Sequence, residues 1–531
     1  MTGLRTDLTG TAQLTGFALR RERTRILLWV VGIVGLVVMT AASVKGLYPT
    51  QADLDEAAAA SEGNAAAIVF NGPAQSLDTV GGQVAFQVGS MGLVVVALMS
   101  LLMVGRLTRG EEEAGRLEMV RSLPVGSQAP TAAASLAVAV INAAVGLLVT
   151  GALLGLDLPV GGAVTFGASF VLVGLVFAGV ALVAAQISEN TRVVYGMSGA
   201  VLGAAFVLRA VGDIGDGTIS WFSPIGWAQK ARPFAGEQWW PFLPLVVAIA
   251  ALLGAAKAVN ARRDLGGGIV APRPGRATAA PSLGHPLGLA VRMQRGSVIG
   301  WSTGILVIGA AYGSLAEGID DFVGDNEALA EMLARAGGAT ITDSYLATCF
   351  IILALTGAGF SVQSALRLRS EETALRVEPL LATPVSRWRW AASHLTVAFG
   401  GSVILLAVAG GSVGLVHGLV SGDLAEVPRL LGASLAHAPA MWVMVGITTV
   451  LVGLVPRAVA MAWAVLSLCF VVGLLGELLG LPGWMRDVSP FEHVPQLPAA
   501  DLAVLPLAVL TALATGLTGI GLAGLRHRDI G

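Results

Sequence analysis

The acidic and basic side chains of this sequence gather in two segments that match one another. Residues 109–125 read RGEEEAGRLEMVRSLPV and residues 369–385 read RSEETALRVEPLLATPV. At a constant offset of 260 residues the charged positions recur: Glu111, Glu112, Arg116 and Glu118 become Glu371, Glu372, Arg376 and Glu378. A glutamate four residues before an arginine favours a helix, as in Glu112 with Arg116 and Glu372 with Arg376. Each segment is therefore predicted to form a short amphipathic helix that ends before Pro124 or Pro384.

Carboxylates clustered in this way can pair with arginine or lysine on another protein. Removing one member of a desolvated pair costs roughly 2–5 kcal/mol, whereas a pair at a solvated rim contributes little. Because the two segments match, we interpret them as two docking surfaces for a partner with twofold symmetry of its own. The alternative is a pair of solvated loops beside a membrane, with no partner.

Two further ionisable residues, Arg209 and Glu477, lie at the ends of apolar runs. Each side chain could reach the outer membrane interface by extending its apolar stem. Alternatively, the two could face each other and gate an exit, since ionisable groups within membrane spans are functional candidates. Trp227 stands where the second copy has His493, so these residues are also exit-gate candidates.

Motifs of several enzyme classes are absent from the sequence. No G-x-x-x-x-G-K-[ST] loop occurs, so the chain is not expected to hydrolyse ATP by itself. Cysteine and histidine show no zinc-site spacing, and both cysteines lie in apolar runs. A G-x-S-x-G match at 410–414 falls inside an apolar run, where glycine more often serves helix packing. No catalytic, cofactor-binding or metal-binding residue is predicted.

The elements that hold these residues are apolar helices. The chain of 531 residues is 55% hydrophobic and 12% charged, about half the charged share of a soluble domain. A helix needs about 20 apolar residues to cross a bilayer. Such runs fall near 26–46, 84–105, 131–155, 160–186, 194–211, 240–260, 298–316, 344–365, 391–416, 430–455, 458–480 and 501–524. Within them Gly174, Gly179, Gly199 and Gly203 are predicted to allow close helix packing.

Three blocks recur in the same order and indicate an internal duplication. Residues 16–33 match 288–305, residues 109–125 match 369–385, and SPIGWAQ at 223–229 matches SPFEHVPQ at 489–496. The predicted fold is an all-α polytopic membrane protein with twelve transmembrane helices. These would form two parallel six-helix repeats about a pseudo-twofold axis along the membrane normal. The first repeat spans 1–260, a linker 261–283, and the second repeat 284–531.

The distribution of arginine and lysine predicts the orientation. With the N-terminus inside, 25 of the 32 basic residues fall in cytoplasmic segments. The loops 47–83 and 316–343 are acidic and would lie outside, where helical stretches over 53–60 and 326–336 are expected to form a cap. We therefore predict a multi-pass protein of the bacterial cell membrane with both termini cytoplasmic. The net charge of −2 gives no field to attract nucleic acid.

The chain resembles the permease of actinobacterial ATP-binding-cassette (ABC) exporters of the polyketide-antibiotic type. The resemblance rests on the R-x-E-E-x-x-x-R-x-E-(x5)-P-V segments, the Arg-rich stretch before each first span and the S-P blocks, and it covers essentially the whole chain. It implies the fold of G-subfamily-like exporters. Connecting helices would lie at 5–24 and 284–296, coupling helices at 109–121 and 369–381, and re-entrant external segments at 219–231 and 485–498.

The same resemblance implies a transport function rather than an enzyme. The chain would be the permease subunit that moves hydrophobic or amphiphilic small molecules outward through a lipid membrane. A separate homodimeric ATP-binding subunit, which carries ATP and magnesium, would dock on the eight charged residues of the two segments. One alternative is an ion-coupled transporter, which needs charges near the membrane midplane. Another is a membrane enzyme acting on lipid-linked substrates, which needs clustered catalytic acids or metal ligands.

Overall fold

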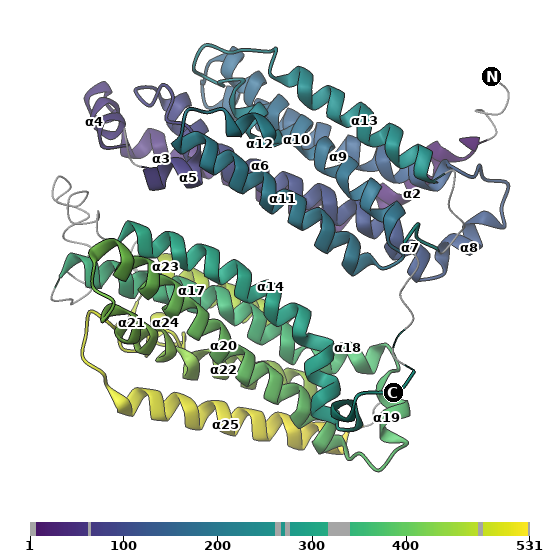
Figure 1. Ribbon diagram of the computed structural model, residues 1–531, viewed down its shortest axis with the longest axis vertical. Helices are drawn as coiled ribbons and strands as arrows, with labels where there is room; N and C mark the ends of the chain where they lie inside the picture. Colours follow the sequence, from purple (N-terminus) through teal and green to yellow (C-terminus); the bar gives the residue numbers. More distant parts are fainter. Residues whose placement is uncertain are drawn as a thin grey trace. The chain divides into compact units, whose positions relative to one another are not determined.

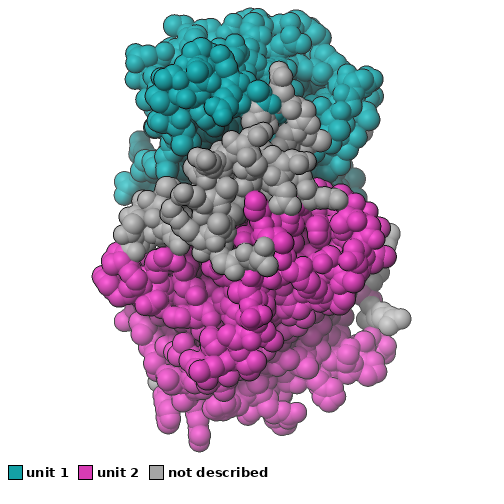
Figure 2. Space-filling model, turned by 90° about the vertical axis from the view of Figure 1, so that its left-hand side faces the viewer, with its two compact units in different colours: residues 1–274 teal, residues 275–531 magenta. Residues whose placement is uncertain are grey.

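Helices make up the regular structure of this chain. The computed structural model describes residues 7–61, 65–260, 267–270, 275, 277–316, 340–475 and 482–528, and every regular element in these ranges is a helix. The chain divides into two compact units, residues 1–274 and 275–531 (Figure 2). This division falls inside the segment 261–283 that the sequence assigns to a linker.

The first unit holds the charged segment of residues 109–125 at one of its ends. Its elements are α2 (Thr11–Arg21), α3 (Arg23–Leu47), α4 (Gln51–Ser61), α5 (Ala65–Asn71), α6 (Val80–Leu107), α7 (Arg109–Glu113), α8 (Arg116–Arg121), α9 (Ala129–Gly155), α10 (Val160–Ile187), α11 (Thr191–Ile214), η1 (Ile219–Phe222), α12 (Pro224–Gln229) and α13 (Phe242–Asn260). Helices α7 and α8 lie at the same end as α2, and α4, α5 and α12 lie at the opposite end (Figure 1). We call the end with α7 and α8 the charged end of this unit.

The second unit has a corresponding charged end, which carries α18 and α19, with α21 and α24 at the opposite end (Figure 1). Its elements are η2 (Pro281–Gly284), α14 (Pro286–Leu315), α17 (Ile341–Ala365), α18 (Arg367–Thr373), α19 (Val377–Leu381), α20 (Arg387–Ser421), α21 (Glu426–Leu435), α22 (Ala438–Leu454), α23 (Met461–Leu475), α24 (Gly483–Arg486) and α25 (Val504–His527).

Eleven helices of the described residues are long and apolar enough to cross a membrane. Six belong to the first unit (α3, α6, α9, α10, α11 and α13), and each overlaps a predicted run. In the second unit α21 and α22 together form one such helix over Glu426–Leu454. The predicted run 458–480 is helical over α23, and residues 476–480 of this run lie outside the described residues. The all-α, multi-pass class is confirmed, and the count of twelve spans stays a prediction.

The two units differ where the chain enters the first span. In the first unit Glu22 separates α2 from α3, and its buried carboxylate pairs with Arg25 at 2.6 Å and Arg106 at 2.9 Å. Burial alone would raise the pKa of Glu22, but the hydrogen bonds from Arg25 and Arg106 outweigh it and lower this pKa below its ordinary value.

Gln294 stands at the matching position of the second unit, and α14 runs through it without a break. Its amide contacts His394 at 3.2 Å and accepts a hydrogen bond from Ser364 at 2.5 Å, so no charge has to be paired there. The predicted connecting helix over 284–296 is therefore helical from Pro286 and continuous with the span that follows it. Residues from Pro286 onward form the first turns of the spanning helix itself.

Glycine allows close helix contacts at some of the predicted positions. A Cβ on Gly174 would lie 1.8 Å from the amide oxygen of Asn142, and one on Gly179 would lie 2.8 Å from Leu252. Gly199 and Gly203, however, have no neighbouring atom within 4 Å in the first unit, so close packing at these two glycines stays a prediction. Both lie on a side of α11 that faces away from the other helices of the first unit.

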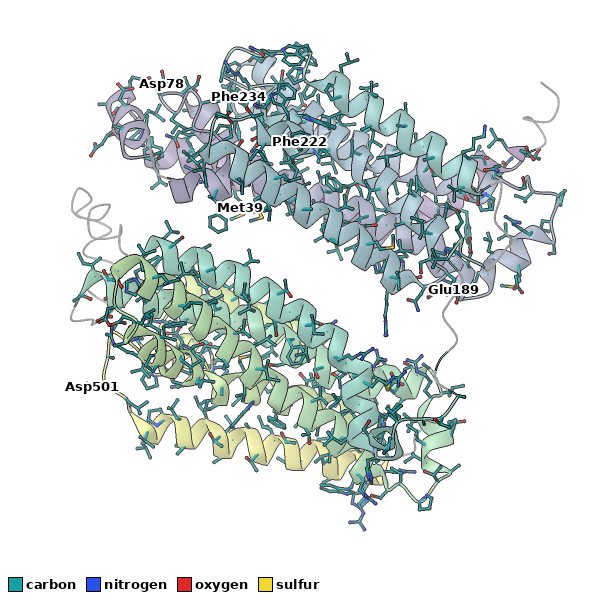
Figure 3. The ribbon with its side chains drawn as sticks, in the orientation of Figure 1. Met39, Asp78, Glu189, Phe222, Phe234 and Asp501 are labelled. Carbon is teal, nitrogen blue, oxygen red and sulfur yellow. The ribbon has the colours of Figure 1, made fainter. Side chains whose placement is uncertain are left out.

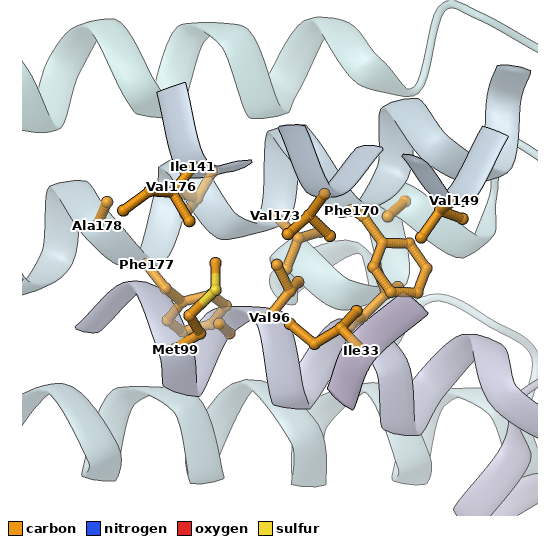
Figure 4. Close-up of a cluster of buried hydrophobic side chains, with 14 of the residues drawn as sticks. Ile33, Val96, Met99, Ile141, Val149, Phe170, Val173, Val176, Phe177 and Ala178 are labelled. Carbon is orange, nitrogen blue, oxygen red and sulfur yellow. The ribbon is translucent and has the colours of Figure 1, made fainter. Parts of the chain in front are cut away.

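The core of the first unit forms where α3, α6, α9 and α10 meet. Ile33, Met99, Ile141 and Phe170 are almost fully buried there (Figure 4). Packing at this density holds α6 in place, and α6 leads directly into α7. Away from this core, α4 confirms the predicted helix over 53–60, whereas the stretch 326–336 lies outside the described residues.

Candidate functional site

Each charged segment is two short helices rather than the single amphipathic helix that the sequence predicts. Gly115 separates α7 from α8 and has φ +69°, in the left-handed region. Leu375 stands 260 residues later, between α18 and α19, and has φ +55°. Glycine adopts this conformation freely, whereas a leucine there is strained. Because both residue types adopt it, the surrounding contacts impose the turn.

This turn changes which charges pair. Arg116 donates two hydrogen bonds to Glu111, both 2.8 Å long, and Arg376 donates two to Glu371 at 2.8 and 3.1 Å. The four-residue pairing of Arg116 with Glu112 assumed an unbroken helix, and the ion pair forms with Glu111 instead. Bonding to the carboxylates raises the pKa of Arg116 and Arg376, so both stay charged.

The second glutamate of each segment pairs with the arginine three residues before it. Arg109 lies 2.6 Å from Glu112, and Arg369 lies 3.0 Å from Glu372. Buried Arg109 also bonds the carbonyl of Ala185 at the end of α10. The four predicted glutamates thus repeat the same two local ion pairs in the two units.

Arginines from distant parts of the chain complete these pairs. Arg21 of α2 donates to both oxygens of Glu111 at 2.8 and 2.9 Å. In the second unit Arg528, just after α25, bonds Glu372 at 2.5 Å. Sequence reasoning missed both arginines because they are 90 and 156 residues from their partners and no local motif marks them. Each charged segment is therefore tied to a helix elsewhere in its unit.

Burial separates the eight predicted residues into two groups. The side chains of Glu111 and Glu112 are only 14% and 10% exposed, and those of Glu371 and Glu372 are 5% and 3% exposed. These four carboxylates form ion pairs with arginines of their own unit. Glu118 and Glu378, by contrast, are exposed, and neither forms an ion pair among the described residues.

Apolar side chains accompany the exposed glutamates. Met119 and Leu123 are 67% and 60% exposed beside Glu118, and Leu375 is 59% exposed near Glu378. We call residues 118–123 and 375–379 the outward faces of the two segments. A mixed apolar and acidic surface of this kind is suited to contact with another protein.

Arg209, an exit-gate candidate, is buried within the first unit. Its guanidinium donates to the backbone carbonyls of Ile68 and Val69 in α5, at 3.2 and 2.8 Å. It also lies 3.4 Å from the carboxylate of Asp213, which in turn accepts a hydrogen bond from Ser220 at 2.6 Å. The side chain thus connects α11 to α5 instead of reaching toward solvent. Its predicted partner Glu477 lies outside the described residues.

The other two gate candidates make different local contacts. Trp227, in α12, donates its indole N–H to the carbonyl of Trp221 at 2.5 Å. His493 is exposed, and its ring contacts the carbonyl of Asp487 at 2.9 Å. The residues around His493 form turns where the first unit has α12, so the two copies differ in structure here as well as in sequence. Gating by any of the four residues stays a prediction.

No group of three or more His, Cys, Asp or Glu side chains that could hold a metal ion occurs in the part of the chain that is described. The site is instead a set of ion pairs and exposed faces at the charged end of each unit.

Two similarities to known proteins bear on this arrangement. A family model described as "Multidrug efflux system permease Rv1217c, C-terminal domain" matches residues 12–260 and 283–526. The multidrug efflux system permease protein Rv1217c of Mycobacterium tuberculosis is 39% identical to the chain over 528 residues. That alignment covers 98% of this chain and 95% of the other protein, and the matched ranges include both charged segments.

Proposed function

Because the chain belongs to the multidrug efflux system permease family, we propose that it is the membrane subunit of an ABC exporter powered by a separate ATP-binding subunit. ATP and magnesium would be bound by that subunit, which would dock as a homodimer. The cargo would be hydrophobic or amphiphilic small molecules, in keeping with the apolar composition of the spans.

The observation that supports this proposal is the repetition of one ion-paired structure at the charged ends of both units. A homodimer presents two equivalent surfaces, so its membrane partner needs two matched contacts. The outward faces supply these contacts, with Glu118 and Glu378 free to pair with arginine or lysine of the ATPase. The buried glutamates have another role, which is to hold each outward face in a fixed position.

The ion pairs also give a route by which movement could reach the spans. Arg21 and Glu111 join the segment α7–α8 to α2, and α7 follows directly from α6. In the second unit Glu372 joins α18 to the end of α25 through Arg528. A bidentate arginine–carboxylate pair has a fixed geometry. Displacement of an outward face would therefore move a spanning helix with it.

Purification of the full-length chain from its native membrane in mild detergent tests the proposal. A co-purifying chain with a Walker A loop, and ATP turnover stimulated by apolar compounds, are the expected results. Efflux that continues without such a chain, and stops when the proton gradient is dissipated, would favour the ion-coupled transporter instead. A panel of compounds in the same assay identifies the cargo.

Charge reversal on both outward faces should uncouple the two subunits. We expect Glu118→Lys combined with Glu378→Lys to lower substrate-stimulated ATP turnover about tenfold or more, since like charges across an interface are unfavourable. The matched control is Asp78→Lys with Asp501→Lys, two exposed acids at the ends opposite the charged ends (Figure 3). Equal turnover in the two double variants would place the contact elsewhere.

We further propose that the charged ends, and with them both termini, face the cytoplasm. In a Cys349→Ala, Cys469→Ala background, an Asp78→Cys variant should react with a membrane-impermeant maleimide in intact cells. A Val270→Cys variant, exposed near the charged end of the first unit, should react only after permeabilisation. Labelling at position 270 alone in intact cells would indicate the opposite orientation, with the charged ends outside.

A further inference from the structure

A basic hollow lies beside the first turns of α14, and we propose that it binds the headgroup of an acidic phospholipid. The hollow measures about 670 Å³ and is formed by the segment that contains η2 together with α14. The lining residues that the proposal uses are Leu283, His285, Leu287, Val291, Arg292 and Arg295. Nothing in the proposed transport function requires this site.

The charge of the hollow is uncompensated. Arg292 and Arg295 are exposed, three residues apart in α14, and so lie on neighbouring positions of the helix surface. Neither has an ion-pair partner in the described structure, and no Asp or Glu is among the residues that line the hollow. Arg21, Arg367 and Arg376, in contrast, are all paired with glutamate. Two free guanidinium groups suit a phosphate, which arginine binds in a bidentate manner.

The apolar part of the lining favours a lipid over a soluble phosphate compound. Leu287 and Val291 are 44% and 48% exposed and lie one helical turn apart, in line with Arg295. The same helix continues through the candidate span Pro286–Leu315, with apolar side chains such as Ile299 on its surface. Apolar and basic side chains together at the entry to a span match the acyl and phosphate parts of a lipid at the interface.

The first unit carries an equivalent pair of arginines, but its described residues place them in a different setting. Arg20 and Arg23 occupy the matching positions and are exposed, yet the helix is interrupted between them at Glu22. The hollow recorded at this end of the first unit measures about 70 Å³ and is lined by Arg21, which is paired with Glu111. The site is therefore proposed for the second unit.

Native mass spectrometry of the full-length chain, with phosphatidylglycerol and phosphatidylcholine of identical acyl chains, tests the proposal. The wild type should retain at least one phosphatidylglycerol more tightly than phosphatidylcholine. Arg292→Gln with Arg295→Gln should weaken that retention about tenfold, with the melting temperature unchanged. The control is Arg192→Gln with Arg457→Gln, which removes equal charge from two exposed arginines, one in the first turn of α11 and one in the turn after α22.

Three outcomes would overturn the proposal. The first is equal retention by the wild type and the Arg292, Arg295 variant. The second is an equal loss in the control variant, which would reflect net charge alone. The third is displacement of the lipid by millimolar glycerol 3-phosphate, which would make the ligand a soluble phosphate compound. A further variant, Leu287→Asn with Val291→Asn, should weaken lipid retention while leaving both arginines in place.

Discussion

Replacing Glu371 with lysine is expected to destabilise the second unit by about 3–5 kcal/mol, the usual consequence of breaking a buried ion pair. The carboxylate of Glu371 lies 2.8 Å from both Arg367 and Arg376. A lysine would bring a third positive charge into this buried position. Both free cysteines, Cys349 and Cys469, are buried in the second unit, so a thiol-reactive fluorophore reports its thermal unfolding directly.

The same substitution at Glu378 is the matched control, because Glu378 is exposed and unpaired in the described structure. Exposed substitutions usually change stability by no more than about 0.5 kcal/mol. The sequence alone treats Glu371 and Glu378 as equivalent members of one docking surface. A Glu371→Lys variant with wild-type melting and lost coupling would support that simpler interpretation and contradict the internal ion pair.

Replacing Arg209 with methionine is expected to release α5 from the first unit. The change leaves the carboxylate of Asp213 buried without its cation and removes the donor to Ile68 and Val69. Leaving a buried charge unpaired costs about 3–5 kcal/mol. Limited proteolysis of the purified chain, with the cut sites read by mass spectrometry, should show new cleavage near residues 65–71.

Neutralising Asp213, the ion-pair partner of Arg209, should recover part of the lost stability of α5. Asp213→Asn in the Arg209→Met background removes the unpaired charge and still offers an acceptor to Ser220, so protection of α5 should partly return. Lys230→Met, which removes a half-buried cation that lies over the ring of Trp221, is a control in which a cation is likewise replaced with methionine. Unchanged proteolysis in Arg209→Met, together with altered efflux, would instead favour the gating role.

The spans were predictable from the sequence because their signal is local. About 20 consecutive apolar residues suffice to identify a span, and only the ends depend on other contacts. Entry to the first span shows this limit. Residues 16–33 and 288–305 match in sequence, yet one contains a break at Glu22 and the other continues through Gln294. The difference depends on Arg106 in one unit and on Ser364 and His394 in the other.

The position of the candidate site was also predictable, but the roles within it were not. Charge and repetition identified residues 109–125 and 369–385. Which glutamates face outward depends on a backbone turn at Gly115 and Leu375, and a leucine gives no sequence signal for a left-handed conformation. The four-residue pairing rule holds only along a continuous helix. Arg21 and Arg528 reach the site only after the whole unit has folded.

The turn at Leu375 implies that the two charged segments differ in stiffness. A leucine held in the left-handed region stores about 1–2 kcal/mol relative to relaxed backbone, and a glycine at the same place stores almost none. Part of the work of straightening the α18–α19 turn is therefore already stored in the resting chain. If the proposed ATP-binding homodimer pushes equally on both segments, the second segment would yield before the first, and a symmetric motor would drive an ordered sequence of movements.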